Sequence, residues 1–122
     1  MARYIDGYVL PVPKNKIKTY KKMAAGMGNI CKKYGALNYV ECVADDLTPK
    51  HSTLKFAQMA KMKKGETVVF SFVIYKSRAH RDAVNAKVMK QMQKDYAKYK
   101  DMPMPFDMKR MAYAGFKALV DL

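Results

Sequence analysis

The segment Thr67-Val-Val-Phe-Ser-Phe-Val-Ile-Tyr75 decides the fold, because it is the densest run of β-branched and aromatic residues in the chain. Such residues favour a strand, so residues 67–75 are predicted to form one. Ser77 then caps a helix that runs to about Gln93. Its inward residues are expected to be Ala79, Ala83, Ala86, Met89 and Met92. After a polar connector over residues 95–105, residues 110–116 form a last strand.

The first half of the chain repeats this strand–helix–strand order. A strand over residues 4–10 ends at Pro11, because proline cannot continue a ladder. From Lys14 a helix follows, and Gly35 stops it. Its apolar residues recur in steps of three and four, namely Ile17, Tyr20, Met23, Ala24, Met27, Ile30, Cys31 and Tyr34. Residues 36–44 return as a strand, and residues 53–62 suggest a short helix.

Two such units predict a ferredoxin-like α+β sandwich: a four-stranded antiparallel sheet with both helices on one face, as one domain over residues 1–122. Side chains alternate along a strand, so each strand divides into two sets. The set with Ile5, Val9 and Phe70 is assigned to the helix side, where Gly7 and Gly115 would allow close approach. The opposite face then collects Tyr4, Asp6, Tyr8, Tyr39, Glu41, Ser71, Tyr75 and Arg110.

This mixed face is expected to be covered by a second copy of the chain, as a homodimer whose sheets enclose a partly polar cavity. The candidate ligand-binding residues are Asp6, Tyr8, Tyr39, Glu41, Ser71 and Arg110. Asp6 and Arg110 are predicted to form a charge-assisted pair, which either fixes the dimer or orients a ligand. A carboxylate left unpaired in such a cavity would have a raised pKa and could act as a base.

The net charge of +14 raises the question of an anionic partner. The charge is spread along the chain, and only Arg3, Arg78, Arg81 and Arg110 are arginines. Sequence-reading sites favour arginine, so a nucleic acid is an unlikely partner. No apolar run approaches the roughly 20 residues of a membrane helix, and no signal peptide is apparent, so a cytoplasmic protein is expected. Cys31 and Cys42 lack metal-ligand spacing and are expected in the core, with no metal or cofactor.

Several longer stretches resemble the YbaA-like family of small bacterial proteins, a domain-of-unknown-function family. They include Tyr4-Ile-Asp-Gly-Tyr-Val-Leu-Pro-Val-Pro13 and Met104-Pro-Phe-Asp-Met-Lys-Arg-Met111. The resemblance extends from Tyr4 to Phe116. It implies a dimeric α/β barrel built from two ferredoxin-like subunits, and a cytoplasmic location. It implies no reaction, substrate or catalytic residue.

The function that these observations favour is binding of an unidentified small molecule, with a cofactor-independent oxygenase or isomerase as the enzymatic form. The alternatives are a non-catalytic regulatory module and a weak, sequence-independent RNA binder that uses the lysine-rich surface. The preference rests on fold analogy and on the mixed sheet face. No residue is assigned a catalytic role.

Overall fold

The computed structural model of the protein describes residues 2–122 and contains one antiparallel sheet with its two long helices on one side. The strands are β1 (Tyr4–Pro13), β2 (Asn38–Val43), β3 (Glu66–Tyr75) and β4 (Ala112–Lys117). The helices are α1 (Ile17–Lys33), α2 (Phe56–Met59), α3 (Arg78–Lys94) and α4 (Tyr96–Tyr99), with 3-10 turns η1 (Lys14–Lys16) and η2 (Met108–Arg110). The predicted α+β class and antiparallel sheet are therefore confirmed.

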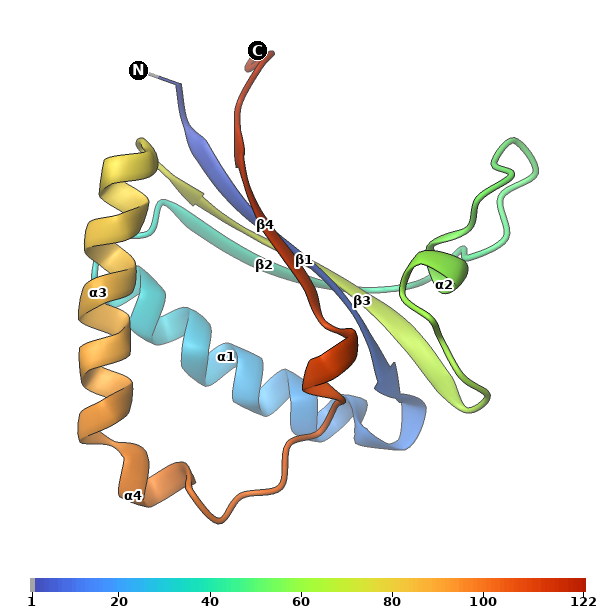
Figure 1. Ribbon diagram of the computed structural model, residues 1–122, viewed down its shortest axis with the longest axis horizontal. Helices are drawn as coiled ribbons and strands as arrows, with labels where there is room; N and C mark the ends of the chain where they lie inside the picture. Colours follow the sequence, from blue (N-terminus) through green and yellow to red (C-terminus); the bar gives the residue numbers. More distant parts are fainter. Residues whose placement is uncertain (1) are drawn as a thin grey trace.

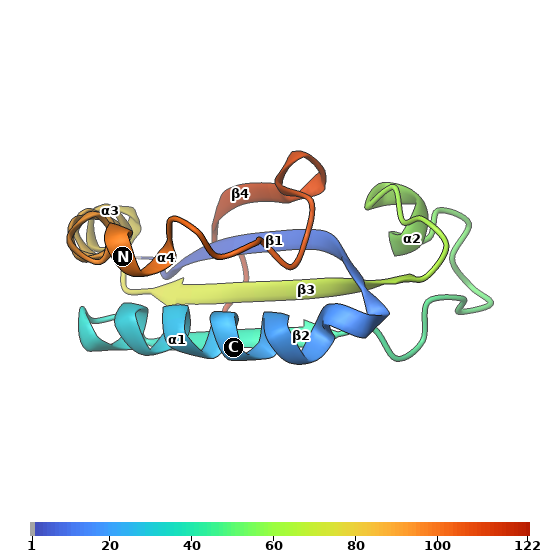
Figure 2. The ribbon, with the colours of Figure 1, turned by 90° about the horizontal axis from the view of Figure 1, so that it is seen from below.

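The sheet order is β2-β3-β1-β4, with every neighbouring pair antiparallel. The β1–β3 ladder forms the centre and pairs Tyr4 with Tyr75 at one end and Pro13 with Glu66 at the other. The helices α1 and α3 lie on the same side of this ladder, while α2 lies at the end of the sheet remote from α3 (Figures 1 and 2). Segments near the two ends of the described chain meet, because the Ala118 amide donates to the Arg3 carbonyl at 2.9 Å.

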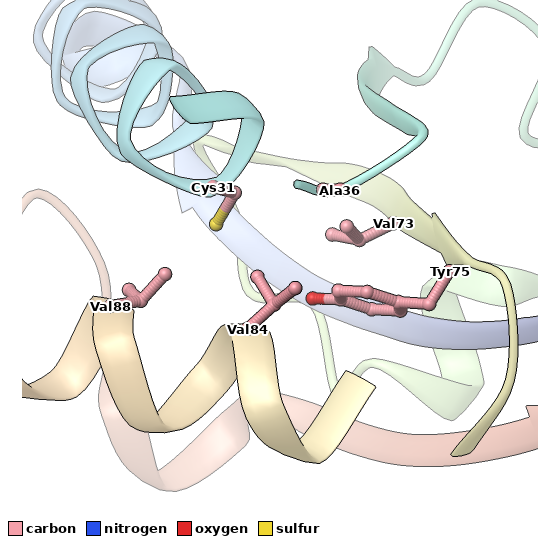
Figure 3. Packing of buried hydrophobic residues seen from close by; sticks show 6 residues of the cluster. All are labelled: Cys31, Ala36, Val73, Tyr75, Val84 and Val88. Atoms are coloured by element: carbon pink, nitrogen blue, oxygen red, sulfur yellow. The ribbon is translucent and has the colours of Figure 1, made fainter. Parts of the chain in front are cut away.

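The core lies between the sheet and the two long helices. One cluster packs α1 and α3 against β3 through Cys31, Val73, Tyr75, Val84 and Val88 (Figure 3). A second cluster joins residues of β1, β3 and α1, and contains Leu10, Val12, Val69, Tyr20 and Ala24. The side of the sheet that faces the helices is thus the one that carries Leu10, Val69 and Val73.

The predicted assignment of the two sheet faces is wrong. The alternation correctly groups Asp6 and Tyr8 with Ser71, but this set faces the helices, because it shares its side with Leu10 and Val73. The side without long helices, called here the open face, is mostly apolar, with Asn38 and Glu66 as its polar strand residues. It presents Ile5, Gly7, Val9, Val40, Cys42, Val68, Phe70, Phe72, Ile74, Ala112, Ala114 and Phe116. Cys42, expected in the core, is exposed there.

The inward side of α3 also differs from the prediction. Ala79, Ala83, Ala86 and Met89 are exposed, whereas Val84 and Val88 are buried. The neighbours of these valines on the inner side are polar: the Tyr75 hydroxyl donates to Asn85 Oδ1 at 3.3 Å, and the Tyr34 hydroxyl donates to Gln91 Oε1 at 2.6 Å. Of the predicted inward residues only Met92 packs against the core, so the helix docks through two valines, this methionine and a row of hydrogen bonds.

None of the helices in the described part of the chain combines the length and apolar character that a bilayer-spanning helix requires.

Two glycines of α1 provide a test of how tightly the helix packs on the sheet. A Cβ at Gly28 would lie 2.6 Å from Tyr39 Cδ1, whereas a Cβ at Gly26 would meet nothing within 4 Å. We expect Gly28→Ala to destabilise the fold by about 1–3 kcal/mol through overpacking. Gly26→Ala should stabilise it by about 0.5–1 kcal/mol, because alanine is the better helix former. Urea unfolding measures both, and equal shifts of the same sign would contradict this packing.

Candidate functional site

Asp6, near the beginning of β1, is a carboxylate with no exposed surface. Its Oδ1 accepts a hydrogen bond from Arg81 Nη1 at 2.6 Å. Its Oδ2 is also buried but accepts no hydrogen bond in the described chain. Burying a charge is expensive unless the charge is paired and hydrogen-bonded, and a buried polar atom without a partner calls for an explanation. Among the side-chain oxygens and nitrogens of the described residues, this is the one that is buried without a hydrogen-bond partner.

Arg81 is brought to Asp6 by the first turn of α3. Ser77 caps this helix, and its Oγ accepts from the His80 amide at 3.1 Å. The guanidinium of Arg81 also donates from Nη1 to the Tyr113 hydroxyl at 2.8 Å and from Nε to Asp82 Oδ1 at 2.7 Å. Burial alone would lower the pKa of Arg81, but the hydrogen bond to Asp82 and the charge of Asp6 outweigh it and raise the pKa. Arg81 is therefore a permanent cation here.

Aromatic rings surround this ion pair. Tyr8 and Tyr113 stack with their centroids 4.8 Å apart and their planes inclined by 22°. The Tyr4 ring centroid lies 4.8 Å from Arg81 Cζ, a cation–π distance. Tyr4 reaches this position because its hydroxyl occupies the space that a side chain at residue 115 would fill, so Gly115 is required there. We call Asp6, Arg81, Tyr4, Tyr8 and Tyr113 the Asp6 cluster.

The phenols of Tyr8 and Tyr113 are held neutral. Burial first, and then the negative charge of Asp6, raise the pKa of Tyr8 and of Tyr113. Each hydroxyl therefore keeps its proton at physiological pH and is able to donate as well as accept hydrogen bonds.

Glu41 forms a second, separate carboxylate site on the same side of the sheet. Its Oε1 accepts from the Tyr20 hydroxyl and its Oε2 from the Tyr39 hydroxyl, both at 2.7 Å. Burial, followed by these hydrogen bonds, raises the pKa of both tyrosines. Both oxygens of Glu41 have partners, so this group ties α1 to β2, whereas Asp6 retains an unused acceptor.

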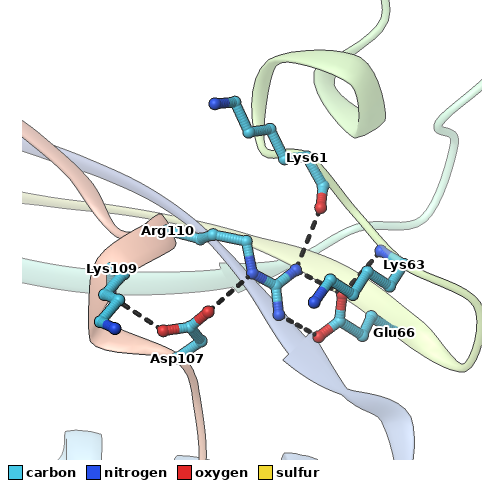
Figure 4. Close-up of polar contacts among 6 residues, drawn as sticks. All are labelled: Lys61, Lys63, Glu66, Asp107, Lys109 and Arg110. Atoms are coloured by element: carbon cyan, nitrogen blue, oxygen red, sulfur yellow. Dashed lines mark hydrogen bonds and ion pairs between the residues drawn. The ribbon is translucent and has the colours of Figure 1, made fainter.

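The predicted Asp6–Arg110 pair is wrong. Arg110 belongs to the turn η2 rather than to β4, so it does not stand beside Asp6. It instead donates from Nη1 and Nη2 to the two carboxylate oxygens of Glu66, each at 2.7 Å, and from Nε to Asp107 at 3.0 Å (Figure 4). Its Nη1 also donates to the Lys61 carbonyl at 3.0 Å. This bidentate clamp joins η2 to the beginning of β3 and to the segment after α2.

The six predicted site residues do not form one site. Asp6 and Tyr8 belong to the Asp6 cluster, and Tyr39 bonds to Glu41. Ser71 lies between these two groups, because β3 pairs it with Tyr8 on one side and with Glu41 on the other. Arg110 lies elsewhere. The row from Tyr113 through Tyr8 and Ser71 to Glu41 runs across all four strands on the helix side.

Sequence reasoning missed Arg81 and Tyr113. A usable signal for Arg81 is its spacing, since it precedes the buried Val84 by three residues and Val88 by seven, which places all three on one side of α3. Tyr113 alternates with Arg110 along the chain, so the prediction that put Arg110 on the face of Asp6 separated Tyr113 from Asp6, whereas β4 in fact pairs Tyr113 with Tyr8.

The surface has two hollows, of which the second borders the Asp6 cluster only at Tyr4. One, of about 450 Å³, is lined by residues between β2 and α2, including Val43, Leu47, Phe56 and Phe70. The other, of about 500 Å³, lies near the termini and is lined by Ala2, Tyr4, Ser77, Arg78, Gly115 and Lys117. Neither is lined by Asp6, Glu41 or Arg110. The predicted polar cavity around these three residues is therefore not one of the two.

The fold and the cluster together define a ferredoxin-like α+β protein with a buried carboxylate–guanidinium pair under its helices. Two solved structures share this fold. One is a dimeric ferredoxin-like protein from an uncultured marine organism, with a TM-score of 0.61, 12% identity and 100% coverage of both chains. The other is a putative antibiotic biosynthesis monooxygenase from Bacillus cereus, with a TM-score of 0.54, 12% identity and coverage of 100% of this chain and 98% of that one.

The chain belongs to the DUF1428 family, a family of proteins of unknown function, whose pattern matches residues 3–108. It is 40% identical over 120 residues to the uncharacterized protein YbaA of Escherichia coli K12, covering 98% of each chain. The uncharacterized protein YbaA of Shigella flexneri matches to the same extent. The resemblance to the YbaA-like family is thus confirmed.

The Glu66–Arg110 clamp predicts a pH dependence of stability. The hydrogen bond from Arg110 lowers the pKa of Glu66 below its ordinary value of 4.5. A group whose pKa is depressed on folding stabilises the fold above its unfolded pKa, and this contribution is lost as the pH falls through the folded pKa. We expect Glu66→Gln to lower the urea midpoint at about pH 7 and to lose less stability than the wild type on acidification to about pH 3.5.

Asp45→Asn, at an exposed loop residue, is the matched control for Glu66→Gln. It should leave the urea midpoints at both pH values close to those of the wild type. If Glu66→Gln lost as much stability as the wild type between about pH 7 and about pH 3.5, the clamp would not contribute to the pH dependence of stability.

Proposed function

We propose that the protein is a homodimer in which each subunit binds a small molecule at the Asp6 cluster. The observation that carries the ligand proposal is the unused Oδ2 of Asp6, a charged acceptor without a donor in the described chain. Buried charged acceptors gain strongly from a hydrogen-bond donor, and the neighbouring arginine and stacked tyrosines add polar and aromatic contacts. A ligand that supplies the missing donor explains why a carboxylate is kept at this place.

The site is placed on the helix side of each subunit rather than between subunits. Asp6 shares its face with the core residues Leu10 and Val73, so a second copy packed on the open face would not touch it. A ligand is expected to reach Asp6 past β4, because Tyr113 on this strand is 47% exposed whereas Asp6 is fully buried.

The open face supports the homodimer. Phe70 is 42% exposed and Phe116 is 57% exposed, and their neighbours on this face are apolar as well. A continuous exposed apolar patch of this kind marks an interaction surface. A structure of the same fold is described as a dimeric ferredoxin-like protein, which favours a second copy as the partner.

For the dimer, we expect light scattering with chromatography to report twice the chain mass of 14.0 kDa. Phe70→Glu places a charge at the centre of the open face and should yield a folded monomer, because a buried unpaired charge strongly disfavours association. Met89→Glu is the control, since Met89 is 58% exposed on α3, away from the open face. A monomeric wild type, or a Phe70→Glu variant that still dimerises, would contradict the proposal.

For the ligand, we expect a fragment screen by protein-observed NMR to yield compounds that shift the signals of Tyr8, Arg81 and Tyr113. Binding of these compounds should weaken at least about tenfold in Asp6→Asn, because the charged acceptor is lost. Asp95→Asn, at the end of α3, is the matched control and should bind normally. Fragments that shift only residues of the two surface hollows would argue against this site.

Because Asp6→Asn leaves Arg81 with only Asp82 as a charged partner, circular dichroism must first show that the variant is folded. Tyr113→Phe provides a second variant on an exposed strand and removes only the hydroxyl that Arg81 contacts. Fragments whose affinity is unchanged in both folded variants would place the binding site elsewhere.

A further inference from the structure

The phenol side chain of Tyr113 is part of the Asp6 cluster. Its ring stacks on Tyr8, its hydroxyl accepts from Arg81 Nη1, and Asp6 is close enough to raise its pKa. Yet Tyr113 comes from the edge strand β4, every residue of which is exposed. Of the cluster's side chains, the Tyr113 phenol is therefore the one that another molecule could displace most easily. Its displacement would not disturb the core beneath α1 and α3.

The cluster has hydrogen-bonding capacity that Tyr113 does not use. Asp6 Oδ2 accepts no hydrogen bond, and Arg81 Nη2 makes none within residues 2–122. Asp6 and Arg81 share a single hydrogen bond. The acceptor Asp6 Oδ2 and the donor Arg81 Nη2 are therefore both unused, and they lie in the same cluster as the face of Tyr8 on which Tyr113 stacks. A hydroxyl group is the ligand group that satisfies both, because it donates one hydrogen bond and accepts others.

We propose that the ligand class of this site is a phenol or enol, a planar molecule with a hydroxyl on an sp² carbon. The inference rests on the proposed function. The ligand takes the place of the Tyr113 ring against Tyr8, its hydroxyl donating to Asp6 Oδ2 and accepting from Arg81. Planarity follows from the stacked ring that it replaces, and the hydroxyl follows from the unused acceptor.

The test uses p-cresol, which is the tyrosine side chain as a free molecule, and its methyl ether 4-methylanisole, which cannot donate. In the wild type, p-cresol competes with the tethered Tyr113 ring, whose effective concentration is high, so binding is weak. In Tyr113→Ala, NMR titration of the full-length protein should show p-cresol binding at least about tenfold more tightly than in the wild type. The methyl ether should bind that variant at least about tenfold more weakly than p-cresol, because the bond to the charged acceptor is missing.

Two further variants distinguish ligand recognition from the filling of a new cavity. Adding Asp6→Asn to Tyr113→Ala should abolish the preference for p-cresol over its ether. Tyr99→Ala, which removes an exposed tyrosine of α4, should bind p-cresol no better than the wild type.

Equal binding of p-cresol and 4-methylanisole to Tyr113→Ala would overturn the phenol or enol class, and so would a preference that survives Asp6→Asn. The comparison of the two compounds on Tyr113→Ala alone decides the question if the double variant does not fold. If neither compound binds but the fragment screen still finds ligands at the Asp6 cluster, the ligand class is wrong and the proposed function stands. If no compound of either experiment binds there, both fail.

Discussion

The buried ion pair between Asp6 and Arg81 is the constraint on which the arrangement of α3 depends. A carboxylate at the centre of a sheet under two helices is stable as an anion only if a cation reaches it, and Arg81 is the cation that does so at 2.6 Å. Since α3 buries only Val84 and Val88, its apolar surface is too small to define its position by itself. The pair, the cap at Ser77 and the polar contacts further along fix the helix against β1 and β3.

The sequence predicts the number and order of the main elements well, because each strand and helix has a local signal. Alternation also sorts most strand residues correctly into two sets, with the exception of β4. Alternation does not reveal which of the two sets faces the helices, because the pattern is the same for both choices. The set with Asp6, Tyr39 and Glu41 looks like a polar outer face. In the fold Glu41 accepts from Tyr39 and Tyr20, and Asp6 pairs with Arg81, so the set serves as an inner face.

The candidate site was predictable only in part, for a similar reason. Asp6 and Tyr8 are identified by their place on a central strand, which a local pattern reveals. Their partners are not, because Arg81 and Tyr113 come from elements distant in sequence, and their approach depends on helix rotation and strand register. Arg110 illustrates the point: one turn before β4 moves its guanidinium to Glu66, at another part of the sheet.

The distribution of charge separates the proposed dimer surface from the proposed ligand site. All five ion pairs among residues 2–122 use arginine, from Arg3, Arg81 or Arg110, and no lysine of that range has a carboxylate within ion-pair distance. The lysines of α1 and α3 are exposed on the outer helix surface, whereas the one charged strand residue of the open face, Glu66, is paired with Arg110. Mutual repulsion of unpaired lysines opposes contact between two helix surfaces, so association through the open face is the arrangement with the least electrostatic cost. In that arrangement both Asp6 clusters stay on the outer side of the sheets, and a substitution that breaks the proposed dimer need not alter the proposed ligand site.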